Sequence, residues 1–93
     1  MNIVEKYGGT SVGTIEQIQA IALHAKHMKE QGHNLVIVAS AMGKTTNKLI
    51  ELAHSVTNNP NKRELDSLLS TGEQQTITLL AIAMNSIGLD AIS

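Results

Sequence analysis

Two adjacent glycines near the amino terminus lie where a loop could hold an anion. Lys6 comes shortly before Gly8 and Gly9, and the hydroxyl side chains of Thr10 and Ser11 follow them. Adjacent glycines let backbone N–H groups approach a phosphate without a side chain in the way, and Lys6 supplies a full positive charge. These residues predict a phosphate-binding loop. A loop that needs glycine only to turn explains the same spacing equally well.

A second candidate loop reads Ser-Ala-Met-Gly-Lys-Thr-Thr at residues 40–46. Its Gly-Lys-Thr run suggests a P-loop, but that motif needs another glycine five positions before Gly43, where this chain has Val38. We therefore reject the P-loop interpretation. Ser40 and Thr46 are instead candidates for binding a small polar substrate, because open α/β sheets bind ligands at the carboxyl ends of their strands. A turn serine and a threonine at a helix start are an equally simple alternative.

A third candidate is Glu73, which follows Ser70-Thr71-Gly72 in a segment of helical composition, residues 62–87. We expect the glycine to interrupt this segment, so that Glu73 begins a helix. A carboxylate at that position interacts favourably with the helix dipole and could bind a substrate ammonium group. A glutamate that only begins a helix is the alternative, and on spacing alone it is favoured.

Alternating strands and helices must position these loops. Thr14 and Gln17 form a capping-box pattern that predicts a helix start, and Gly32 is its expected end. The apolar run at 35–39 predicts a strand buried on both faces, as in a parallel sheet with right-handed crossovers. The expected order is a strand at 2–6, the helix that ends at Gly32, the strand at 35–39, a helix capped by Thr45 or Thr46, the interrupted segment 62–87, and a strand that begins at 89–93.

Composition excludes several classes of protein. The 93 residues include no cysteine, which removes disulfides, thiol nucleophiles and cysteine-bearing zinc sites. The net charge of −1 argues against nucleic-acid binding, and no apolar run approaches the length of a membrane span. His24 and His27 lie near each other but have no third ligand, so we predict no metal site. Residues 1–6 lack a signal pattern, so we expect a cytoplasmic protein.

Three separated motifs together resemble the amino-terminal part of aspartate kinases, in the amino acid kinase family. They are KYGGTSVG at 6–13, VASAMGKTTN at 38–47 and KRELDSLLSTGEQ at 62–74. The resemblance implies an α/β fold, a three-layer αβα arrangement with a mostly parallel sheet that is incomplete at the carboxyl terminus. Residues 1–93 would then be the amino-terminal part of the catalytic domain.

The resemblance also implies an activity and a set of site residues. Aspartate kinases transfer the ATP γ-phosphoryl group to the β-carboxylate of L-aspartate, giving 4-phospho-L-aspartate, the first step of lysine, threonine and methionine biosynthesis. The nucleotide carries Mg²⁺. Tyr7 stands where the family often has phenylalanine. By motif position, the ATP-phosphate segment is Lys6, Tyr7, Gly8, Gly9, Thr10 and Ser11, with Lys6 catalytic, and the aspartate-binding residues are Ser40, Thr46 and Glu73, with Glu73 facing the substrate's amino group.

The family's catalytic domain is much longer than 93 residues, which bears on what this chain does alone. We expect the isolated chain to have little or no kinase activity, and we expect the full-length enzyme to form homo- or hetero-oligomers. Two alternatives stay open. One is a non-catalytic remnant or interaction module that keeps the half-fold. The other is a different carboxylate or phosphate kinase of the same fold.

Overall fold

Two parallel strands form the sheet of the computed structural model, which describes the whole chain, Met1–Ser93. β1 (Asn2–Tyr7) pairs with β2 (Asn34–Ala39), and Tyr7 lies opposite Ala39 at their carboxyl ends. The β-branched residues of both strands favour this extended backbone. The predicted parallel pairing is confirmed, and both strands extend slightly beyond their predicted bounds.

The connection from β1 to β2 passes through a short 3-10 helix, η1 (Gly9–Val12), and then α1 (Ile15–Glu30). The capping box is confirmed, because the Thr14 hydroxyl accepts a hydrogen bond from the Gln17 N–H and the Gln17 side chain accepts one from the Thr14 N–H. Gly32 has φ +88°, a backbone conformation that glycine adopts without steric cost, and it lets the chain turn back into β2.

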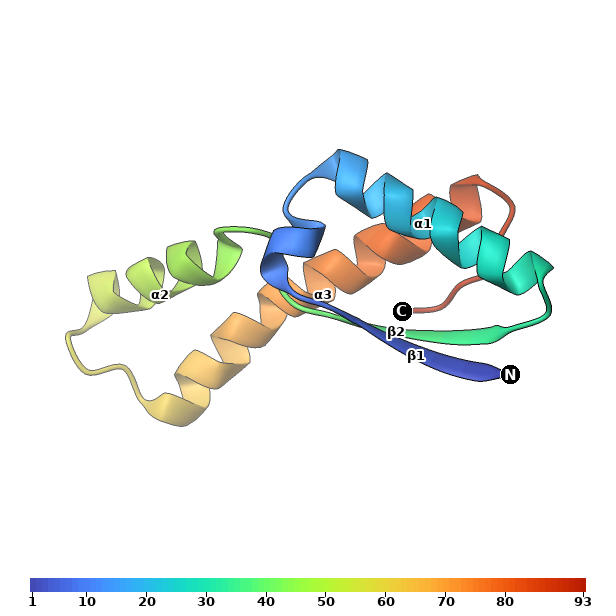
Figure 1. Cartoon of the computed structure of the whole chain (residues 1–93). Helices are drawn as coiled ribbons and strands as arrows, with labels where there is room; N and C mark the ends of the chain where they lie inside the picture. The colour runs from blue at the N-terminus through green and yellow to red at the C-terminus, as the bar shows by residue number, and fades with distance from the viewer.

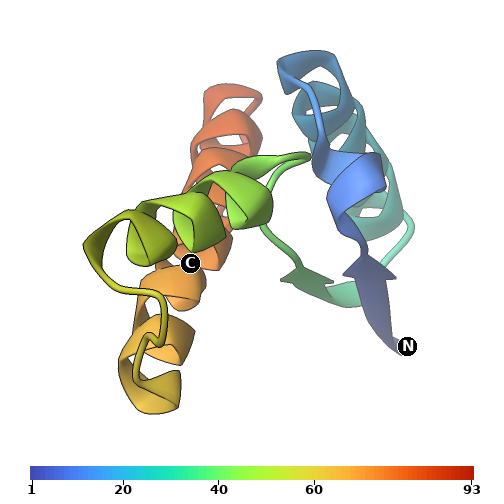
Figure 2. The same ribbon diagram turned by 90° about the vertical axis from the view of Figure 1, so that its left-hand side faces the viewer.

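Two helices cover one face of the sheet. α1 and α3 (Lys62–Ser86) pack side by side over β1 and β2, as Figures 1 and 2 show. Lys26 of α1 donates a 2.8 Å hydrogen bond to the Ile87 carbonyl, so a cation lies at the carboxyl end of α3, where the helix dipole is negative. The core between these layers contains Val12, Ile18, Ile21, Ala22, Ala25, Ala39, Leu80 and Met84.

The opposite face of the sheet is open. Val4, Val36 and Val38 lie on it and are 62%, 58% and 50% exposed. The prediction that the strand at 35–39 is buried on both faces is therefore wrong for this chain, because α1 and α3 both pack on the other face. Residues 89–93 form no strand, so that prediction is also wrong, although Leu89 and Ala91 pack against the core.

α2 (Thr45–Val56) and the first half of α3 project from the body as a helical hairpin, residues 45–71, which we call the arm (Figure 1). No residue of α2 is buried, and the Cα trace extends 50 × 24 × 18 Å. Lys44 occupies the position before α2 and no side chain caps it, so neither Thr45 nor Thr46 is the predicted cap. None of the helices combines the length and the apolar composition that crossing a membrane requires.

α3 is one continuous helix, so the predicted interruption at residues 70–72 is wrong. Its buried residues begin at Gly72 and recur at every fourth position: Gly72, Thr76, Leu80 and Met84. A Cβ at Gly72 would lie 2.9 Å from the Ala41 Cβ and 3.2 Å from the Thr45 Cγ2. The glycine is therefore a contact point, where α3 passes against the chain between β2 and α2, and not a helix break.

Replacing Gly72 with alanine should destabilise the chain despite the better helix propensity of alanine. Alanine favours the helix by about 1 kcal/mol, but overpacking costs about 1–3 kcal/mol, so we expect the free energy of unfolding to fall by about 1 kcal/mol. Urea unfolding followed by circular dichroism measures the change. In an Ala41→Gly background the loss should be smaller, because the 2.9 Å contact is gone while the 3.2 Å contact with Thr45 remains. Equal losses in both backgrounds would show that Ala41 does not constrain Gly72.

Candidate functional site

The loops that follow β1 and β2 meet at the carboxyl edge of the sheet. The Ser40 N–H donates a 3.0 Å hydrogen bond to the Tyr7 carbonyl, and the Gly43 N–H donates a 3.0 Å hydrogen bond to the Gly9 carbonyl. These bonds continue the strand pairing beyond the last strand residues. The structure thus brings the first two sequence motifs together as a pair of loops in backbone contact.

Gly9 and Gly43 are required by this contact. A Cβ at Gly9 would lie 3.2 Å from the Ala41 carbonyl oxygen, a distance tighter than ordinary van der Waals contact. Gly43 has φ +43°, in the left-handed region that side chains disfavour, and its Cβ would lie 3.6 Å from the Gly13 Cα. For these two glycines, packing between the loops explains the residue type.

Gly8 differs from both. Its φ of −79° and ψ of 173° suit any residue, and a Cβ there would meet nothing within 4 Å. No backbone hydrogen bond within the chain uses the N–H groups of Gly8, Gly9 or Thr10, so three consecutive donors are free. Nothing in the chain itself requires a glycine at position 8. The space beside it and the free donors match what an anion needs.

Gln17 holds this loop in place from the first turn of α1. Its side-chain oxygen accepts a 2.7 Å hydrogen bond from the Gly13 N–H, and its side-chain nitrogen donates a 2.9 Å hydrogen bond to the Thr10 carbonyl. The sequence predicted Gln17 as part of a helix cap but missed these loop contacts. The signal was a glutamine, which both donates and accepts, placed four residues after Gly13.

The other predicted phosphate-binding residues surround the first loop. Lys6 is exposed near the end of β1, opposite Val38 in the register and on the open face of the sheet. Thr10 and Ser11 are exposed in η1. The Tyr7 side chain lies on the inner face of the sheet against the core and not over the loop.

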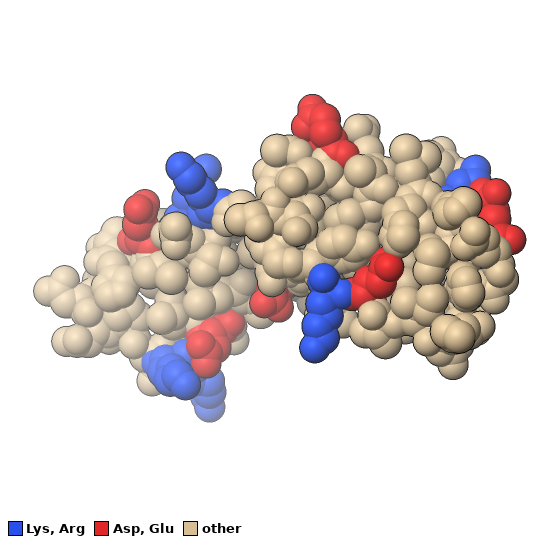
Figure 3. Space-filling view, viewed as in Figure 1, with Lys and Arg blue, Asp and Glu red and all other residues tan.

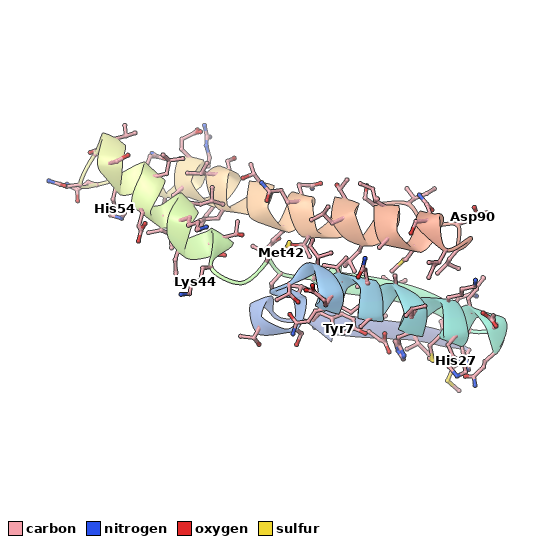
Figure 4. The ribbon with its side chains drawn as sticks, turned by 90° about the horizontal axis from the view of Figure 1, so that it is seen from above. Tyr7, His27, Met42, Lys44, His54 and Asp90 are labelled. Carbon is pink, nitrogen blue, oxygen red and sulfur yellow. The ribbon has the colours of Figure 1, made fainter.

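The three predicted substrate-binding residues come from different elements that meet at one place. Ser40 is exposed just after β2, and Thr46 is exposed in the first turn of α2. Glu73 is exposed on α3, in the turn that Gly72 packs against Ala41 and Thr45. The expectation that Glu73 begins a helix is wrong, because α3 runs through it, so the helix-dipole argument does not apply. Figure 4 shows Met42 at this junction and Lys44 on the side of the arm.

A cluster of three polar side chains lies on the inner face of β1. The Tyr7 hydroxyl donates a 2.9 Å hydrogen bond to Glu5 Oε1, and His24 Nε2 of α1 lies 2.8 Å from Glu5 Oε2. Figure 4 shows Tyr7 beside α1. This cluster could not be predicted from the sequence, because residues 5 and 24 are far apart in the chain and only the packing of α1 on β1 brings them together.

The cluster changes two pKa values. The hydrogen bond from His24 lowers the pKa of Glu5, partial burial opposes this, and the Tyr7 hydroxyl lowers it further. Burial raises the pKa of Tyr7 to about 12, and the hydrogen bond to Glu5 and the negative charge of Glu5 add to that rise. At neutral pH Glu5 is therefore a carboxylate and Tyr7 a hydrogen-bond donor.

Charged residues form no concentrated patch on the face that Figure 3 shows. Figure 3 shows acidic and basic side chains interspersed over the visible face. No three histidine, aspartate or glutamate side chains are grouped so that they could hold a metal ion. The geometry at the sheet edge therefore suits an anion bound by N–H donors and a lysine, with hydroxyl and carboxylate groups nearby for a second, polar ligand.

Comparison with known proteins gives consistent matches over the whole chain. The amino acid kinase family model matches residues 1–93. The chain is 53% identical over 91 residues to aspartokinase 2 of Bacillus subtilis and 48% identical over 89 residues to an aspartokinase of Thermus thermophilus. Those stretches are 98% and 96% of this chain, but 22% of each relative, so the chain spans about a fifth of their length.

A solved structure, the aspartate kinase from Synechocystis, superposes with a TM-score of 0.95 at 52% identity. The match covers 99% of this chain and 16% of that one. At this likeness the predicted fold class is confirmed. The parallel strand pair with its covering helices is part of an αβα fold.

The Tyr7 phenol should titrate well above its ordinary range. Because its pKa is raised to about 12 from 10, the stability it contributes is complete below pH 10 and is lost as the pH rises toward 12. Tyr7 is the only aromatic residue, so the ultraviolet absorbance of the phenolate reports it alone. In Glu5→Gln the midpoint should fall toward 10. A midpoint near 10 in the unaltered chain would contradict the partial burial of the Tyr7 hydroxyl and its hydrogen bond to Glu5.

Proposed function

The chain belongs to the amino acid kinase family, and we propose that residues 1–93 form the amino-terminal part of an aspartate kinase catalytic domain. The proposed reaction transfers the γ-phosphoryl group of ATP to the β-carboxylate of L-aspartate and gives 4-phospho-L-aspartate, which begins lysine, threonine and methionine biosynthesis. The high identity to aspartokinases over the whole chain supports this choice within the family.

The proposal rests on the presence of glycine at position 8, where the chain itself does not require one. Its backbone conformation suits any residue, and no neighbouring atom excludes a side chain, yet the position holds glycine beside three free N–H donors. A bound group would explain the empty space, because glycine lets a ligand approach the backbone closely. We assign this space to the ATP phosphates. The alternative, a glycine needed only for turning, accounts for Gly43 but not for Gly8.

The proposed site follows the chemistry of phosphoryl transfer. The β-carboxylate of aspartate is ionised at neutral pH, with a pKa of about 3.9, so the reaction needs no general base. It needs two anions aligned and the developing charge neutralised. In this proposal Lys6 is the catalytic cation, and Tyr7, Gly8, Gly9, Thr10 and Ser11 form the phosphate segment.

The second ligand, L-aspartate, is assigned to the junction of the second loop with α2 and α3. In the proposal Ser40 and Thr46 donate hydrogen bonds to its carboxylates, and the Glu73 carboxylate binds its ammonium group. Support comes from the contact of Gly72 with Ala41 and Thr45, which holds the turn bearing Glu73 beside this loop. The two ligands would then lie on neighbouring loops, as an in-line transfer requires.

Mg²⁺ would enter with the nucleotide. The residues of the site offer N–H groups, hydroxyls and a lysine, which suit phosphate oxygens, and no carboxylate cluster is present that could hold the ion. Bound to ATP, Mg²⁺ would neutralise phosphate charge during transfer. We also propose that the full-length enzyme is a homo- or hetero-oligomer, so that a second protein subunit is a further partner.

Lys6→Ala in the complete polypeptide that carries this chain should lower kcat by about 10²–10³, the scale for losing one electrostatic stabiliser of a transition state. Steady-state assays of aspartyl phosphate formation with ATP and L-aspartate measure it. An unchanged kcat with only a higher KM for aspartate would exclude the catalytic role. Complete inactivity of the unaltered polypeptide with aspartate, but turnover of another carboxylate or phosphate acceptor, would favour the other kinases of this fold.

Gly8→Ala should separate ligand binding from folding. The new Cβ enters the proposed phosphate space, and overpacking of about 1–3 kcal/mol corresponds to an ATP affinity that is lower by roughly 5- to 150-fold. Because nothing in the chain lies within 4 Å and the backbone conformation suits alanine, the free energy of unfolding should stay the same or rise by up to about 1 kcal/mol. Gly9→Ala is the matched control and should destabilise the fold through the Ala41 carbonyl. Normal ATP binding by Gly8→Ala would remove the main support for the site.

A further inference from the structure

We propose that Glu5, Tyr7 and His24 form a positioning unit that sets the phosphate-binding loop, and that their hydrogen bonds act on ATP binding rather than on aspartate binding. The inference rests on the proposed function, since it assigns a role toward the same ATP site. None of the three side chains touches the proposed phosphate space. They are positioning residues and not catalytic ones.

The geometry of the unit fixes the Glu5 carboxylate at both oxygens. Oε1 accepts from the Tyr7 hydroxyl at 2.9 Å, and Oε2 lies 2.8 Å from His24 Nε2. The Glu5 side chain is 23% exposed and that of His24 is 42% exposed. A carboxylate with a donor at each oxygen is held in one orientation, because a change of rotamer would break both bonds in a partly desolvated place.

Tyr7 transmits this constraint to the first loop. It is the last residue of β1, and Gly8 follows it directly. Glu5 and Tyr7 lie two residues apart on the same face of β1, so their hydrogen bond directs the ring back along the strand. The aromatic ring is thereby held against the core, and the space beside Gly8 stays open.

α1 is linked to β1 at one point and to the first loop at another. His24 ties its middle to Glu5, and Gln17 ties its first turn to Thr10 and Gly13. The free donors at Gly8, Gly9 and Thr10 lie between these two attachments. Removing one of these hydrogen-bond attachments should leave the fold intact, because the apolar contacts between α1 and the sheet remain. It should, however, allow the N–H groups of residues 8–10 to move.

The test compares ATP binding and steady-state kinetics of the complete polypeptide with those of Tyr7→Phe and Glu5→Gln. Tyr7→Phe keeps the ring and removes only the hydroxyl. A hydrogen bond contributes about 0.5–1.5 kcal/mol, so we expect the Kd and KM for ATP to rise by about two- to tenfold. The KM for aspartate should stay unchanged. In the double variant the rise should be smaller than the product of the two single rises, because Tyr7→Phe already removes the hydrogen bond whose acceptor Glu5→Gln alters.

His24→Ala should raise the Kd for ATP in the same way, and His27→Ala is its matched control. His27 lies one turn further along α1, is exposed, and makes no side-chain hydrogen bond to β1. Urea unfolding identifies any variant that fails to fold, and Tyr7→Phe then decides the outcome.

Three outcomes would overturn the inference. Unchanged ATP binding in Tyr7→Phe and Glu5→Gln would show that the unit does not position the loop. Equal rises in the KM values for ATP and aspartate would show a general structural role. Failure of the unaltered polypeptide to bind ATP at all would overturn the proposed function as well, which distinguishes that case from the first two.

Discussion

The backbone contact between the two loops at the sheet edge is the constraint on which the site depends. Parallel pairing brings the carboxyl ends of β1 and β2 together, and the bond from the Gly43 N–H to the Gly9 carbonyl extends that pairing into the loops. Such an approach is possible only with almost no side chain between the two backbones. This hydrogen bond uses the Gly9 carbonyl as its acceptor and does not involve the N–H groups of residues 8–10. Those N–H groups therefore stay available as donors.

The arm depends on the same place in the fold. α3 passes from an exposed half in the arm to a buried half in the body at Gly72, where it touches Ala41 and Thr45. One residue without a side chain therefore holds the second loop, the start of α2 and the middle of α3 together. The open face of the sheet, with Val4, Val36 and Val38, is where a further layer of an αβα fold would pack.

The sequence predicted elements better than it predicted contacts. The capping box at Thr14 and Gln17 and the turn at Gly32 were found, because each depends on neighbouring residues alone. The parallel pairing was found because a strand–helix–strand order implies it. The break at Gly72 was wrong, since low helix propensity and close packing both select glycine, and only the position of Ala41 distinguishes them. The exposure of Val36 was missed for a related reason. Apolar residues on both faces of a strand indicate that both faces are covered in the complete fold. They do not indicate which face the helices of residues 1–93 cover.

Charge on β1 is separated by the alternation of its side chains. Successive residues point to opposite faces of a sheet, so Glu5 lies on the inner face and Lys6 on the open one. A carboxylate facing an anion site would repel it, whereas here the negative charge is directed inward between Tyr7 and His24. The cation remains on the outer side at the end of the same strand. A strand of six residues can therefore supply a lysine for an anion and a carboxylate that fixes the neighbouring loop, because the backbone keeps the two charges on different faces.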